Sequence, residues 1–158
     1  MIRRKRVNVF QISMMLLKVS PQFSDVDSFQ HINHLATLRW FEAGRMPICQ
    51  LFAPDLDLAQ MRLVMVRIEA DYLAEMFLGS DVEIRTAVSK IGNSSFHIAQ
   101  EAYQNGKLTA RGTVVLVHFD RESKRAVPLT PEMRQSLEDI KRQTADLYAA
   151  VDGEGNWP

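Results

Sequence analysis

The sequence contains one cysteine, Cys49, no excess of charge of either sign and no long hydrophobic run. A single cysteine excludes an internal disulfide, no Cys/His spacing resembles a zinc site, and we expect a reducing, cytoplasmic setting. The 19 basic residues balance 19 acidic ones, so nothing in the charge favours nucleic acid or an anionic membrane surface. No run approaches the ~18 apolar residues of a membrane span.

Length and apolar content favour one globular domain. The chain has 158 residues, of which 46% are hydrophobic, enough for a core and too many for disorder. The start weakly imitates a signal peptide, but Asn8, Gln11 and Ser13 interrupt its apolar run, so we expect a non-secretory protein. The expected divisions are an N-terminal extension over 1–14, a domain over 15–149 and a flexible tail over 150–158.

A polar stretch over 24–34 gathers two carboxylates, two imidazoles and two side-chain amides immediately before an apolar helix. Backbone N–H groups at a helix start are unpaired and the helix dipole is positive there. This position is suited to polarising a carbonyl or holding an anion. We place the helix over about 33–45, with Pro47 interrupting it, and Arg39, Glu42 and Arg45 as its only exposed stripe.

Alternating apolar and polar residues predict five strands, and an amphipathic helix follows them. Asn105-Gly106 is a strong hairpin signal between two of the strands. The fold class is therefore α+β, with a long, mostly antiparallel sheet curled around a central apolar helix. Open edges of such a sheet favour self-association. The expected strands cover 15–23, 62–73, 81–91, 95–104 and 107–119, and the C-terminal helix covers 131–148.

The polar stretch and its helix carry a family resemblance. The pattern resembles the hotdog-fold acyl-CoA thioesterases of the 4-hydroxybenzoyl-CoA thioesterase-like group, and the resemblance covers about 16–140. Three positions depart from the family pattern: Gln30 replaces a glycine, His34 an asparagine and Thr37 a tyrosine. The residues that match most closely are Asp25-x-Asp27-x-x-x-His31-Ile32-Asn33 and Leu38-Arg39-Trp40-Phe41-Glu42-x-x-Arg45.

The resemblance implies a catalytic role for Asp27, as nucleophile or as a base that activates water. It implies that His31, Asn33 and His34 orient this carboxylate or supply oxyanion donors. Without the resemblance, an aspartate before a helix is more often a cap or an Asx turn. The implied reaction hydrolyses an acyl-CoA, or an acyl-carrier thioester, to a free acid and a thiol, with no metal and no redox cofactor.

The resemblance also suggests substrate-binding residues. Trp40 and Phe41 are candidates for the acyl pocket, although such residues are more often plain core. The turn residues Asn93, Ser94 and Ser95, with Lys90 nearby, are candidates for contacting coenzyme A across the interface of a homodimer, which can pair into a tetramer. Ordinary turn polarity explains this segment equally well.

Two alternatives stay open. A hotdog hydratase or dehydratase has an Asp/His pair at a spacing that Asp27 and His31 do not reproduce well. A non-catalytic acyl-CoA or acyl-carrier binding protein would keep the fold without the chemistry. Release of free thiol from acyl-CoAs separates these alternatives from a thioesterase.

Overall fold

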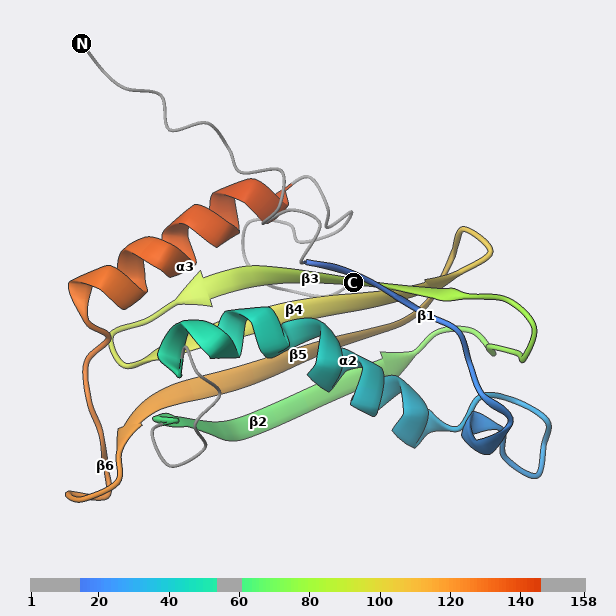
Figure 1. Ribbon diagram of the computed structural model, residues 1–158, viewed down its shortest axis with the longest axis horizontal. Coiled ribbons are helices and arrows are strands. Elements are labelled where there is room, and N and C mark those ends of the chain that lie inside the picture. Colours follow the sequence, from blue (N-terminus) through green and yellow to red (C-terminus); the bar gives the residue numbers. More distant parts are fainter. Residues whose placement is uncertain (1–14, 54–60, 146–158) are drawn as a thin grey trace, which may run out of the picture.

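The computed structural model describes residues 15–53 and 61–145 (Figure 1). The expected extension over 1–14, the tail over 150–158 and the last residues of the expected C-terminal helix lie outside these ranges. The elements in chain order are β1 (Leu16–Val19), η1 (Phe23–Asp25), α2 (His34–Cys49), η2 (Gln50–Phe52), β2 (Leu63–Tyr72), β3 (Val82–Ile91), β4 (Ser95–Gln104), β5 (Lys107–Asp120), β6 (Arg125–Ala126) and α3 (Pro131–Thr144).

The strands form one antiparallel sheet in the order β1-β3-β4-β5-β2, with the two-residue β6 on β5. This arrangement confirms the predicted fold class, and the prediction of 95–104 agrees with β4 at both ends. β6 lies between the last predicted strand and the C-terminal helix, where no strand is predicted, and the first strand is shorter than predicted. β2 lies at one edge of the sheet, because among the described residues it pairs only with β5.

Helix α2 lies across one face of the sheet, with α3 on the β3 side (Figure 1). Two glycines allow α2 to approach closely. A Cβ added to Gly44 would stand 3.0 Å from a methyl of Ile84, and one added to Gly112 would stand 2.9 Å from the ring of Phe41. Below about 3 Å something must shift, so the sheet holds α2 at this depth because both positions lack a side chain.

The structure corrects two details of the predicted helix. α2 continues through Pro47 to Cys49. The hydrogen bond that Pro47 cannot donate falls on the carbonyl of Ala43, which is exposed, so water can replace it. Arg45 is 6% exposed rather than part of the solvent stripe, and burial lowers the pKa of its guanidinium. The close approach at Gly44 turns Arg45 onto a flank of the helix, and Leu35 and Ala43 face water instead.

The opposite face of the sheet carries a row of alternating charges. Cross-strand pairing places Arg85 beside Glu101, Glu101 beside Arg111, and Arg111 beside Asp71. Glu101 is completely buried, and Tyr103 Oη donates to its carboxylate at 2.9 Å. Opposite charges side by side stabilise neighbouring strands. This face therefore places residues of opposite charge next to one another across four strands, whereas the face beneath α2 is packed mainly with apolar side chains.

The contact between Gly112 and Phe41 predicts a specific coupling. Gly112→Ala should destabilise the fold by about 1–3 kcal/mol, because the new methyl overlaps a buried ring. Phe41→Leu opens a space beside the methyl, so the double variant should lose less stability than the two single variants summed. Denaturant unfolding of the four proteins measures this, and strictly additive losses would contradict it.

Candidate active site

A tight loop precedes α2 and places the predicted catalytic residue. Asp27 N–H donates to the carbonyl of His31 at 2.9 Å, and Gln30 N–H donates to the carbonyl of Asp27 at 3.0 Å. Val26 and Ile32 close the base of the loop as an isolated β-bridge. The loop is thus built mainly by its own backbone.

The carboxylate of Asp27 is fixed by main-chain donors. Its Oδ1 accepts from Phe29 N at 2.9 Å and from His31 N at 3.3 Å. This is the Asx-turn geometry expected of an aspartate that merely shapes a loop. Both bonds use one oxygen, and Oδ2 has no hydrogen-bond partner within the described ranges. The same turn therefore holds Oδ1 with two hydrogen bonds and leaves Oδ2 without one inside the described ranges.

Asp25, two residues earlier, ties the loop to the rest of the site. Its Oδ1 accepts from Arg39 at 2.7 Å and its Oδ2 from Gln22 N at 2.8 Å. Its carbonyl accepts from Asn33 N at 2.7 Å. Asp25 is 7% exposed and fully engaged by these contacts, so its position is that of a loop-ordering carboxylate.

The start of α2 has one backbone N–H without an acceptor in the described part of the chain. Asn33 caps α2 by accepting from Leu35 N at 2.8 Å through its side chain, and its carbonyl accepts from Ala36 N at 2.9 Å. Asn33 N–H is itself bonded to Asp25. In the described part of the chain, the N–H of His34 has no acceptor, and it points from the positive end of the helix.

The segment that follows β2 braces this loop, and no local pattern in the sequence indicates this contact. Ile32 N–H donates to the carbonyl of Met76 at 2.8 Å. The ring of His31 lies edge-on to Phe77, with centroids 5.2 Å apart, and its Nδ1 stands 3.5 Å from Glu75 Oε1. The imidazole thus faces this segment, and the hydrogen bonds between His31 and Asp27 use the main chain of His31.

Tyr72 adds a second contact that the sequence does not predict. Its Oη donates to the carbonyl of His34 at 2.9 Å, and the two rings meet edge-on with centroids 6.2 Å apart. The residues are 38 positions apart in the chain. Neither periodicity nor spacing could pair them, because the contact depends on where α2 lies on the sheet.

The other predicted site residues divide into two groups. Trp40 and Phe41 are buried beneath α2, in the same apolar cluster as Ile32 at the base of the loop. The turn over 93–95 lies at the far end of the sheet, where His118 N donates to the carbonyl of Ser94 and Arg134 donates to that of Gly92. Lys90 is exposed near this end. Within one chain, Lys90 and the turn over 93–95 therefore lie at the opposite end of the sheet from Asp27.

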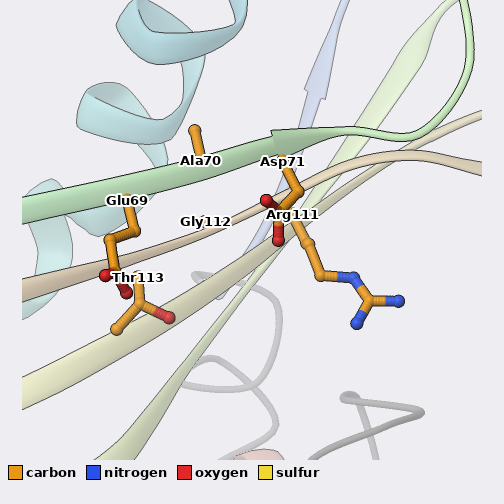
Figure 2. A pocket seen from close by; sticks show the side chains of 6 residues that line it. All are labelled: Glu69, Ala70, Asp71, Arg111, Gly112 and Thr113. Atoms are coloured by element: carbon orange, nitrogen blue, oxygen red, sulfur yellow. The ribbon is translucent and has the colours of Figure 1, made fainter. Parts of the chain in front are cut away.

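An open hollow of about 410 Å³ lies on the charged face of the sheet. Figure 2 shows the side chains of Glu69, Asp71 and Thr113 on the side away from α2, with Arg111 beside Asp71. None of the predicted site residues lines this hollow. It is therefore separate from the loop of Asp27.

No three His, Cys, Asp or Glu side chains within 15–53 and 61–145 are grouped to hold a metal ion. None of the helices in those ranges is long and apolar enough to span a membrane.

A family model described as the thioesterase-like superfamily matches residues 21–137. The chain belongs to this superfamily. The match includes both the loop of Asp27 and the whole of the sheet except β1, so the expected family is confirmed.

Superfamily relatives include proteins with and without assigned activities. The chain is 30% identical over 122 residues to the uncharacterized protein YsmA of Bacillus subtilis (strain 168), covering 76% of this chain and 82% of that protein. A predicted thioesterase from Bacillus stearothermophilus is 37% identical with a TM-score of 0.78, over 80% of this chain and 95% of that one. A thioesterase from Thermus thermophilus, solved with coenzyme A and Zn, is 30% identical with a TM-score of 0.70, over 77% and 95%.

We expect the departure at Gln30 to lower the stability of this superfamily member. Gln30 has a φ of 64°, in the left-handed region that favours glycine. Gln30→Gly should raise the free energy of unfolding by about 0.5–1 kcal/mol, since relief of strain outweighs the added freedom of the unfolded chain. Thermal unfolding checks this, with Lys124→Gly (φ 54°) as a matched control in a distant turn. A destabilised Gln30→Gly variant would show that the side chain itself holds the loop.

Proposed function

We propose that the protein hydrolyses acyl-CoA thioesters, with Asp27 as the catalytic carboxylate. The observation that carries this proposal is the pairing of a fixed carboxylate with a backbone N–H at the start of α2 that has no acceptor among the described residues. Superfamily membership supports thioester hydrolysis, and the coenzyme A bound by the Thermus thermophilus thioesterase supports a CoA thiol in the substrate.

The geometry supports different roles for the carboxylate of Asp27 and the N–H of His34. As a nucleophile, Oδ2 of Asp27 would attack the thioester carbonyl carbon and form an anhydride that water then hydrolyses. As a base, Oδ2 would take a proton from a water that attacks the same carbon directly. The N–H of His34 would donate to the oxygen of that carbonyl as negative charge develops on it, and the helix dipole would add to this stabilisation. On either route the thiolate of coenzyme A would leave and take up the proton that the water gives, so that one water is consumed for each acid and thiol released.

The hydrolase proposal predicts thiol release that depends on the charge of Asp27. A panel of aliphatic and aromatic acyl-CoAs, assayed with a thiol-detecting reagent, should give turnover with at least one member. Asp27→Asn should lower kcat by roughly 100- to 10,000-fold. The fold should persist, because the amide oxygen can still accept from Phe29 N and His31 N.

Asp120→Asn is the matched control for this substitution. Asp120 accepts from Ser123 N at 2.9 Å in a turn at the other end of the sheet, so it undergoes the same chemical change in a similar setting. Full turnover by Asp27→Asn would refute the catalytic assignment. Binding of acyl-CoA by the wild type without thiol release would support the non-catalytic alternative, and hydration of an enoyl-CoA would support the hydratase.

We also propose that the protein assembles as a homodimer through β2. Six apolar or aromatic side chains along this edge and just after it are each more than 40% exposed, and unpaired edge strands of this kind attract a second strand. A symmetric copy offers the matching strand. These side chains are Val64, Met65, Val66, Ile68, Tyr72 and Leu73.

Antiparallel pairing of two β2 strands would also bring together predicted site residues that lie at opposite ends of one chain. The start of β2 shares its end of the sheet with the turn over 93–95, because Leu63 pairs with His118 and His118 N donates to Ser94. The end of β2 reaches the start of α2, beside the loop of Asp27, through Tyr72. A two-fold axis between the two β2 strands would therefore bring the turn over 93–95 of one copy toward Asp27 of the other. Lys90 and Asn93 would then be placed to contact coenzyme A.

Oligomeric state tests this arrangement. Ile68→Glu should shift the protein from dimer to monomer in analytical ultracentrifugation, because two carboxylates would face one another near the axis. Leu16→Lys is the control, since Leu16 is a similarly exposed apolar residue on the opposite edge, where β1 is only four residues long. A monomeric wild type, or a dimer unaffected by Ile68→Glu, would contradict the proposal.

A further inference from the structure

We propose that Tyr72 is a positioning residue that holds the oxyanion donor of His34 in place from the edge strand. Its hydroxyl donates to the carbonyl of His34 at 2.9 Å, and its ring meets the His34 imidazole edge-on. The effect of Tyr72 on the reaction rests on the proposed thioesterase function, whereas its effect on the helix start does not.

The contact acts on the residue that bears the oxyanion donor. The N–H of His34 shares a peptide plane with the carbonyl of Asn33, which accepts from Ala36 N, whereas the carbonyl of His34 lies in the next plane. The bond from Tyr72 anchors this second plane, so both planes that meet at the Cα of His34 are held. A donor whose direction is fixed before reaction loses nothing to reorganisation as charge develops. Asn33 fixes the neighbouring N–H of Leu35, but among the described residues only Tyr72 reaches His34 from outside the helix.

Tyr72 is suited to donating this bond. It stands at the end of β2, paired with Ala110, so the sheet fixes its backbone. Partial burial raises the pKa of its phenol, which keeps the hydroxyl protonated at neutral pH. The hydroxyl is already committed to His34, so Tyr72 needs no contact with the reacting atoms to act.

The neighbouring contacts allow the bond to be removed without unfolding the loop. Ile32 N–H remains bonded to Met76, and Asn33 N–H remains bonded to Asp25. Tyr72→Phe keeps the ring and its packing on His34. The substitution therefore isolates the hydroxyl, and it should leave the thermal midpoint close to that of the wild type.

The experiment compares Tyr72→Phe with Tyr103→Phe in two measurements. Tyr103 is the matched control: it lies on β4 and its hydroxyl also bonds a partner, Glu101, but on the opposite face of the sheet. Amide hydrogen exchange without substrate should become faster over residues 32–36 in Tyr72→Phe and stay unchanged there in Tyr103→Phe. In the thioesterase assay, kcat should fall about three- to tenfold in Tyr72→Phe, as expected for one lost hydrogen bond, with KM within twofold of the wild type.

A third variant separates the hydroxyl from the ring contact. His34→Ala keeps the carbonyl and removes the imidazole, so Tyr72→Phe should have the same effect on exchange in this background. Loss of the effect would overturn the assignment in favour of the ring contact. Unchanged exchange over 32–36 in Tyr72→Phe, or an equal change in Tyr103→Phe, would overturn it outright.

The two proposals fail in different ways. A wild type that releases no thiol from any acyl-CoA would refute the proposed function, and the exchange measurement would still decide the role of Tyr72. A wild type that is active, with Tyr72→Phe raising KM and leaving kcat and exchange unchanged, would make Tyr72 a substrate contact and would overturn its role as a positioning residue.

Discussion

The position of α2 on the sheet is the constraint on which the rest of this structure depends. Gly44 lets the helix settle against Ile84, and Gly112 lets Phe41 settle against the sheet, at distances that leave no room for a side chain at either glycine. Gln100 adds a polar anchor by donating to the carbonyl of Phe41 at 2.7 Å and to Thr86 at 3.0 Å. These contacts fix both the depth and the rotation of α2 on the sheet. They therefore also fix where the helix begins.

The position of the Asp27 loop depends on that placement of α2. Its hydrogen bonds are mostly made by backbone groups, which many sequences could supply, so the local turn alone would not aim a carboxylate at a fixed point. The aim comes from two attachments: Asp25 to Arg39 on the helix, and Ile32 to Met76 after the edge strand. A substitution in the loop is thus expected to act locally, whereas one beneath α2 would move the whole site.

The sequence is sufficient for the elements that depend on local pattern. Alternation locates the long strands, Asn105-Gly106 locates a hairpin, and the apolar run after a capping residue locates α2. Sequence reasoning fails where tertiary contacts decide. Pro47 does not interrupt the helix, because solvent can replace the bond that proline cannot donate. Arg45 is buried and not exposed. Its charge alone does not indicate which side of the helix faces the sheet.

The same division applies to the candidate site. Asp27, Asn33 and His34 are neighbours in sequence, so their grouping follows from the chain, and the family pattern selects Asp27 among them. Tyr72, Glu75 and Phe77 come from the end of β2 and the connection after it, and no spacing rule links them to a loop so much earlier in the chain. Their contribution follows only from the fold, which returns the chain to the helix start.

The placement of Tyr72 gives the edge strand a second physical role. Among the described residues, β2 pairs with a neighbouring strand on one side only, and its last residue is hydrogen-bonded to the first residue of α2. An edge strand with one neighbour is less restrained than a central strand, since half of its backbone groups lack a strand partner. Pairing with a second copy would restrain β2 along its length and, through Tyr72, restrain His34. Assembly and the alignment of the oxyanion donor would then be coupled by a single hydrogen bond, without any movement of the core.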